Sequence, residues 1–106
     1  MSTSIREILF ELHRRLETLY GDRLVKVILY GSHARGDAGS ESDIDVLVVL
    51  KDLVSAWLEI ERTGKDVAEL SLEHDVVISC LFMAEERYLT RNSPLLLNVR
   101  REGVLV

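Results

Sequence analysis

The chain has 106 residues, of which 47% are apolar and 29% charged. This composition excludes wholesale disorder and, with the length, predicts one compact globular domain over residues 1–106. Its formal net charge is −5 and its basic residues are scattered, which disfavours binding to long nucleic acids because phosphate contacts dominate that affinity. The apolar runs are too short for a membrane span, the first residues lack a secretory signal, and the single cysteine, Cys80, fits a reducing compartment. We therefore expect a cytoplasmic protein with no membrane partner.

The first half of the chain predicts one helix and two strands. Ser4 and Glu7 have the spacing of a capping box, and the apolar residues that follow recur at helical intervals as far as residue 19. Residues 24–30 are apolar and β-branched, which is typical of a buried strand. A polar stretch with three glycines, residues 31–42, separates this strand from a second one over residues 43–50.

The second half of the chain predicts, in order, a helix, a strand, a short helix and a last helix. Residues 53–72 form a helical pattern that Gly64 bends or divides, and residues 75–81 form a third strand. A short helix over residues 84–89 precedes a last helix in residues 93–103, where Ser-Pro provides the start and a glycine the stop. The alternation predicts an α/β (α+β) fold in which helices pack on a small β-sheet.

Two aspartates open the second predicted strand. Asp43 and Asp45 are two residues apart, so their carboxylates point to the same face, roughly 6.6 Å apart along the strand, and can hold metal ions between them. Hard cations such as Mg²⁺ prefer carboxylate oxygens. The alternative is a solvent-facing strand edge, although aspartate is disfavoured in strands and Leu47 and Val49 continue the same face into the core. The pair alone leaves both interpretations open.

A Gly-Ser dipeptide lies ten residues before this pair. Gly31 follows a predicted buried strand, where glycine lets the backbone approach a ligand closely, and a helix that begins near Ser32 would offer N–H groups to a phosphate. An isolated dipeptide of this kind is more often an ordinary turn. The combined spacing of Gly-Ser and Asp-x-Asp, however, is expected by chance in only roughly one chain in a thousand of this length.

This pattern resembles the signature of the polymerase-β-like nucleotidyltransferase superfamily, and the flanking residues 34–36 and 42–48 resemble its minimal nucleotidyltransferase branch. The resemblance implies the polymerase-β-like nucleotidyltransferase fold, ATP as substrate and two Mg²⁺ ions. It assigns nucleotide binding to Gly31 and Ser32, and metal binding and catalysis to Asp43 and Asp45.

The same family usually has a third catalytic carboxylate on a later strand. Asp75 is the matching position, since it opens the third predicted strand, and we expect it to be a catalytic and metal-binding residue. Arg35 is the expected ligand of the triphosphate, with an ion pair to Asp37 or Glu41 as the alternative. Trp57 is expected in the core.

The resemblance also implies a biological role. Minimal nucleotidyltransferases of this kind accompany a small HEPN ribonuclease in two-gene toxin–antitoxin modules, in which the antitoxin transfers AMP from ATP to a tyrosine of the toxin. We therefore expect a Mg²⁺-dependent enzyme that acts as the antitoxin of a type VII-like module. Because the chain is too short for an acceptor domain, we expect it to assemble with the toxin or with itself.

Two other functions remain as alternatives. The chain could be an antitoxin that neutralises its partner by contact alone, although a pure binding module has no need of the aspartate pair. It could instead modify a small molecule such as an aminoglycoside, although it lacks the length for a substrate domain.

Overall fold

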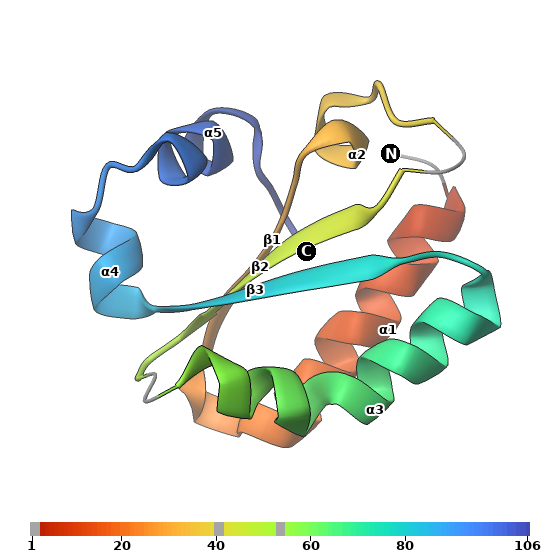
Figure 1. Cartoon of the computed structure of the whole chain (residues 1–106), viewed down its shortest axis with the longest axis horizontal. Coiled ribbons are helices and arrows are strands. Elements are labelled where there is room, and N and C mark those ends of the chain that lie inside the picture. The colour runs from red at the N-terminus through yellow and green to blue at the C-terminus, as the bar shows by residue number, and fades with distance from the viewer. Residues whose placement is uncertain (1–2, 40–41, 53–54) are drawn as a thin grey trace.

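The computed structural model describes residues 3–39, 42–52 and 55–106 (Figure 1). A four-stranded sheet separates two groups of helices, and none of the described helices is long and apolar enough to cross a membrane. In chain order the elements are α1 (Thr3–Tyr20), the 3₁₀ helix η1 (Gly21–Arg23), β1 (Leu24–Tyr30), α2 (Ser32–Arg35), β2 (Ile44–Leu50), α3 (Ala56–His74), β3 (Ile78–Ala84), α4 (Glu85–Thr90), α5 (Pro94–Glu102) and β4 (Val104–Leu105).

The sheet is mixed, with the strand order β3-β2-β1-β4. Strand β1 is antiparallel to both β2 and β4, whereas β2 and β3 are parallel. Asp45 pairs with Tyr30 on one side and with Ser79 on the other. The end of β1 and the beginnings of β2 and β3 therefore meet at one edge of the sheet.

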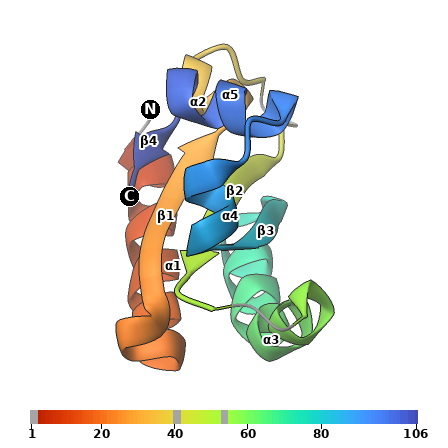
Figure 2. The same cartoon turned by 90° about the vertical axis from the view of Figure 1, so that its left-hand side faces the viewer.

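The two faces of the sheet carry different helices (Figures 1 and 2). Even-numbered residues of β2 pack against α1 and α3, because alternate side chains of a strand point to opposite faces. Odd-numbered residues of β2 point to the other face, toward α4 and α5, where they join a second apolar cluster: Ile28, Leu47, Val49, Met83, Leu96 and Val99.

The predicted fold class, helices packed on a small mixed sheet, is confirmed. Strand β1 has the predicted bounds, and α5 begins after Ser93, whose hydroxyl accepts a hydrogen bond from the N–H of Leu96 at 3.3 Å. The predicted start, at residue 53, of the helix expected over residues 53–72 lies outside the described residues. Strand β4 is too short for a periodic pattern and was not predicted.

Helix α3 differs from its predicted packing in one respect. Trp57 is 65% exposed, so the expectation that it belongs to the core is wrong. The buried stripe of α3 runs through Glu59, Thr63 and Leu70, and Trp57 lies on the opposite side of the helix. Glu59 is buried because it accepts a hydrogen bond from the Tyr20 hydroxyl at 2.7 Å.

Gly64 does not divide α3, which is continuous through this position. It is exposed, and a methyl group added there would have no atom within 4 Å. We therefore expect Gly64→Ala to stabilise the protein by about 0.5–1 kcal/mol, because glycine in a helix interior loses more backbone entropy than alanine. Urea unfolding of both proteins measures the difference. A loss of stability would contradict the continuous helix.

Candidate active site

The candidate site begins where β1 ends. Gly31 has φ 80° and ψ −157°, a conformation open essentially to glycine alone. A Cβ atom placed on Gly31 would lie 2.6 Å from Oδ2 of Asp45, well inside van der Waals contact. Both the backbone angles and the approach of this carboxylate therefore require glycine at position 31.

Asp43 and Asp45 lie at the beginning of β2, and only Asp45 belongs to the strand. Asp43 is exposed and Asp45 is half-buried, on the sheet face that also carries α4 and α5. Burial raises the pKa of Asp45, and the negative charge of Asp43 raises it further. Nearby His33 and Arg35 lower the pKa of Asp45, but less than burial and Asp43 raise it. Neither carboxylate has a hydrogen bond or ion pair with a described residue, so no direct partner neutralises this pair within that part of the chain.

Helix α2 begins at Ser32, which meets the condition under which its N–H groups could contact a phosphate. The carbonyl oxygen of Gly31 accepts hydrogen bonds from the N–H groups of Ala34 and Arg35, both at 3.1 Å, and this fixes the turn after β1. The helix packs on β1 and β2 (Figure 1), and a ring nitrogen of His33 lies 3.1 Å from the carbonyl oxygen of Ser42, the residue before Asp43. Ser32 is half-buried at the first turn of this helix.

Arg35 forms the ion pair that the sequence offered as an alternative. Its Nε donates to Asp37 at 3.2 Å and its Nη1 donates to Glu102 of α5 at 3.2 Å. The hydrogen bond to Asp37 is the main cause that raises the pKa of Arg35. The other predicted partner, Glu41, lies outside the described residues. About half of the Arg35 side chain remains exposed.

Asp75 does not open β3, contrary to the sequence-based expectation. It caps α3 in the left-handed conformation, with φ 52°, and donates its N–H to the carbonyl of Ser71, while β3 begins only at Ile78. The residue of β3 beside Asp45 is Ser79. Over the described ranges, no group of three or more His, Cys, Asp or Glu side chains could hold a metal ion, so Asp75 does not join the aspartate pair.

The aspartate pair fits a hard divalent cation. Its donors are carboxylate oxygens, which Mg²⁺ prefers, and the like charges of the two groups favour a cation between them. Two protein carboxylates are enough for Mg²⁺, which commonly takes its other ligands from water and substrate phosphates.

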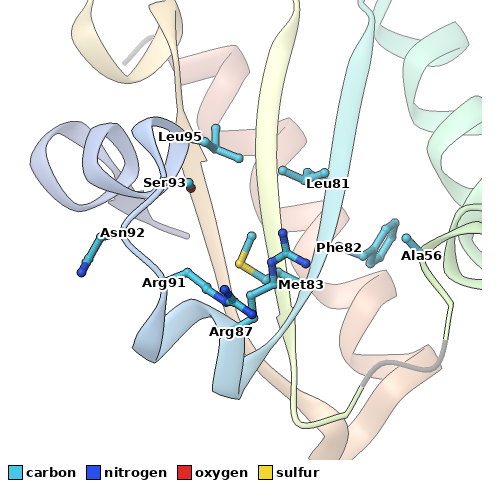
Figure 3. Close-up of a pocket in the computed structure, with 9 residues that line it drawn as sticks. All are labelled: Ala56, Leu81, Phe82, Met83, Arg87, Arg91, Asn92, Ser93 and Leu95. Atoms are coloured by element: carbon cyan, nitrogen blue, oxygen red, sulfur yellow. The ribbon is translucent and has the colours of Figure 1, made fainter.

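A cavity of about 620 Å³ lies between β3, α4 and α5 (Figure 3). Leu81 and Met83 of β3 and Leu95 of α5 line it, together with the side chains of Arg87 and Arg91. We did not predict this cavity from the sequence. The only feature of the sequence that indicates the cavity is the spacing of these two arginines. They are four residues apart at a short helix, so their side chains lie on one face.

Comparisons with known proteins identify the family of this chain. The sequence pattern of the family described as "Nucleotidyltransferase domain" matches residues 9–100. The protein named "Putative protein adenylyltransferase MJ0141", from Methanocaldococcus jannaschii, is 40% identical over 75 residues, which are 71% of this chain and 75% of the relative.

Solved structures share the fold at lower sequence identity. A crystal structure described as a toxin-antitoxin with AMP-PNP has a TM-score of 0.67 and 19% identity, over 91% of this chain and 69% of the other. A complex described as a tri-AMPylated HEPN toxin of Shewanella oneidensis with an MNT antitoxin has a TM-score of 0.62 and 15% identity, over 94% and 69% of the two chains. Because the family pattern covers most of its length, this chain belongs to the nucleotidyltransferase domain family.

Proposed function

We propose that this chain is a Mg²⁺-dependent protein adenylyltransferase that transfers AMP from ATP to a tyrosine of a partner HEPN toxin, as the antitoxin of a type VII-like module in the cytoplasm. The observation that carries the proposal is the pair Asp43 and Asp45, which has no hydrogen bond or ion pair with a described residue, beside the close approach of Gly31 to Asp45. A relative of 40% identity is named as a protein adenylyltransferase, and toxin–antitoxin complexes share the fold, which supports the proposal.

In this proposal each part of the site has one task. Asp43 and Asp45 hold Mg²⁺, with two ions expected, and Gly31 and Ser32 contact the phosphates of ATP. Arg35 exchanges its exposed ion pair for the triphosphate, which costs little because surface ion pairs contribute only about 0–1 kcal/mol. When bound, Mg²⁺ neutralises phosphate charge and lowers the pKa of the attacking hydroxyl.

The reaction requires one bond to form and one to break. The tyrosine oxygen forms a bond to the α-phosphorus of ATP, the bond from that phosphorus to the bridging oxygen of the β-phosphate breaks, and pyrophosphate leaves with its electron pair. The hydroxyl proton passes to solvent or to a carboxylate on the acceptor side. Asp75, at the end of α3, is the candidate for that carboxylate.

The test is label transfer to the helical protein encoded beside this chain, with ATP labelled at either the α- or the γ-phosphate. We expect the α-label on that protein, no γ-label, loss of transfer with EDTA and recovery with excess Mg²⁺. Gel filtration of the same mixture measures whether the two proteins associate. A stable complex without label would favour the contact-only antitoxin, and label on added kanamycin instead of protein would favour the small-molecule enzyme.

A further inference from the structure

The cavity beside β3 has Leu81 and Met83 in its wall, which lie on the same face of the sheet as Asp45. Asp45 pairs with Ser79, and the next residue of β3 on that face, Leu81, is part of the cavity wall. Since a strand rises about 3.3 Å per residue, the cavity begins roughly 6–7 Å from the level of Asp45. A molecule in the cavity can therefore reach the aspartate pair.

The cavity wall is cationic on one side and apolar on the other. Figure 3 shows Arg87 and Arg91 extending from the α4 segment over the sheet, while Leu81, Met83 and Leu95 supply the apolar side. Neither arginine forms an ion pair with a described residue, and the adjacent Glu85 and Glu86 of α4 do not neutralise them. Two positive charges four residues apart repel each other, so an anion in the cavity is favoured.

Hydrogen bonds from Arg100 fix the backbone beside the two exposed arginines. Arg100 of α5 donates to the carbonyl oxygens of Tyr88 and Arg91 at 2.6 and 2.8 Å and to the Asn92 side chain at 3.0 Å. These contacts hold the turn between α4 and α5 that carries Arg91. They also add a third positive charge that has no carboxylate partner among the described residues.

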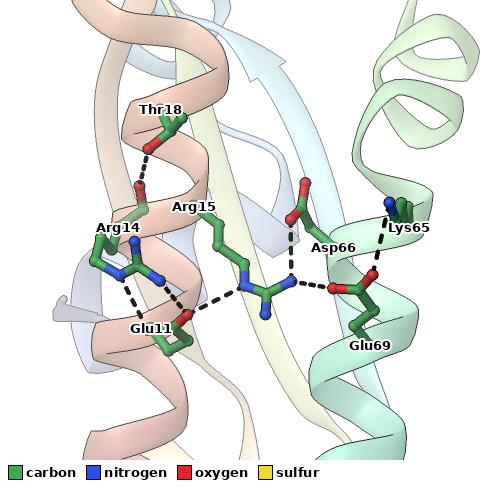
Figure 4. Close-up of polar contacts among 7 residues, drawn as sticks. All are labelled: Glu11, Arg14, Arg15, Thr18, Lys65, Asp66 and Glu69. Atoms are coloured by element: carbon green, nitrogen blue, oxygen red, sulfur yellow. Dashed lines mark hydrogen bonds and ion pairs between the residues drawn. The ribbon is translucent and has the colours of Figure 1, made fainter.

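Several other arginines of this acidic chain form ion pairs with carboxylates. Figure 4 shows Arg15 of α1, which donates to Glu11, to Asp66 at 3.0 Å and to Glu69 at 2.8 Å. Arg23 donates to Asp52 at 2.8 Å. The net charge of the whole chain is −5, so the chain has more carboxylates than basic side chains. The lack of a carboxylate partner for Arg87 and Arg91 among the described residues is therefore a local feature and does not follow from an excess of positive charge.

The position of the cavity relative to α2 indicates which substrate it receives. Helix α2 covers β1 and β2, whereas the cavity lies over β3, so the aspartates of β2 lie between them. In phosphoryl transfer the attacking and leaving oxygens are roughly in line on opposite sides of the phosphorus. If the phosphates of ATP contact the α2 side, the acceptor hydroxyl enters from the β3 side.

We propose that this cavity binds the acceptor protein through an acidic segment, in which carboxylates contact Arg87 and Arg91 and an apolar side chain beside the acceptor hydroxyl packs on Leu81, Met83 and Leu95. This inference rests on the proposed function for the identity of the reaction. The binding site itself is independent of transfer and is tested without ATP.

The test is binding of a fluorescent nine-residue peptide that has a central tyrosine, a leucine on each side and glutamates outside them. In fluorescence anisotropy we expect the native chain to bind it at least tenfold more tightly than a peptide with glutamine in place of every glutamate. The double variant Arg87→Gln/Arg91→Gln is expected to lose this preference. A matched control, Lys65→Gln/Arg101→Gln, removes the same charge from exposed positions outside the cavity and is expected to keep it.

Three results would overturn the inference: equal affinity for the two peptides, unchanged binding by the double variant, or loss of preference in the control as well. Weakened binding of ATP by the double variant, with peptide binding intact, would assign the cavity to the nucleotide and also overturn it. Circular dichroism confirms that each variant is folded. If the peptide binds as expected but no AMP is transferred, the proposed function is contradicted and the anion-binding site still stands.

Discussion

Replacement of Asp45 by asparagine is expected to abolish AMP transfer while leaving the protein at least as stable as the native chain. The charge of this half-buried carboxylate is opposed by burial and by Asp43, which is why its pKa is raised. An ionised group of raised pKa destabilises the folded state, and neutral asparagine removes that cost. Transfer is lost because Asp45 would be a ligand of the metal, and the metal stabilises the charge of the transition state by several kcal/mol. The rate is therefore expected to fall by about a thousandfold or more.

The measurements are the transfer rate from α-labelled ATP, the Tm and the affinity for Mn²⁺ by calorimetry. Asp43→Asn is expected to behave in the same way, whereas Asp22→Asn, an exposed aspartate of η1, serves as the control and is expected to change none of the three. Transfer that survives in both Asp43→Asn and Asp45→Asn would contradict the assignment of the pair as metal ligands. A lowered Tm in Asp45→Asn would contradict the electrostatic argument.

Asp75→Asn separates the two roles that a third carboxylate can have. Since Asp75 lies at the end of α3 and outside the aspartate pair, we expect unchanged Mn²⁺ affinity. A general-base role on the acceptor side would appear as a fall in the transfer rate alone, typically about a hundredfold or more. Unchanged transfer would remove Asp75 from the site.

The elements that position the aspartate pair could be predicted because their signals are local. Strand β1 is a continuous apolar run, and α5 has Ser93 and Pro94 at its start, so both the pattern and the cap indicate the same boundary. The beginning of β3 was predicted three residues too early. Val76 and Val77 are as apolar and β-branched as the strand itself, but they follow Asp75, which caps α3 in the left-handed conformation, and the strand begins only at Ile78.

The remaining differences depend on tertiary contacts. Trp57 is exposed because the buried stripe of α3 is set by Glu59, a charged residue that no hydrophobic pattern places in a core. Glu59 is tolerated there because Tyr20 and Arg62 donate hydrogen bonds to it, at 2.7 and 2.9 Å. Likewise, the partner of Arg35 on α5, Glu102, is 67 residues away in sequence and becomes a neighbour only in the folded chain.

Replacement of Gly31 by alanine is expected to lower the rate of AMP transfer by roughly a hundredfold, because a shift of the reacting groups by about 1 Å is enough for such a loss. The added methyl group would lie 2.6 Å from Oδ2 of Asp45, so the carboxylate must move away from its native position. The variant is also expected to be less stable by about 1–3 kcal/mol, because alanine is strained at φ 80° and ψ −157°. Transfer of α-label and urea unfolding measure the two effects.

Gly21→Ala is the matched control, since it separates strain from displacement of the carboxylate. Gly21 also has a positive φ, 53°, but a Cβ atom there would have nothing within 4 Å, and η1 lies at the end of α1 that precedes β1. Alanine at position 21 is therefore expected to lose about 1 kcal/mol of stability through the left-handed conformation and to retain AMP transfer. If both variants lost transfer in proportion to their stability, Gly31 would act only through the fold. Loss of transfer in Gly31→Ala alone would show that the chemistry depends on the close approach of Gly31 to Asp45.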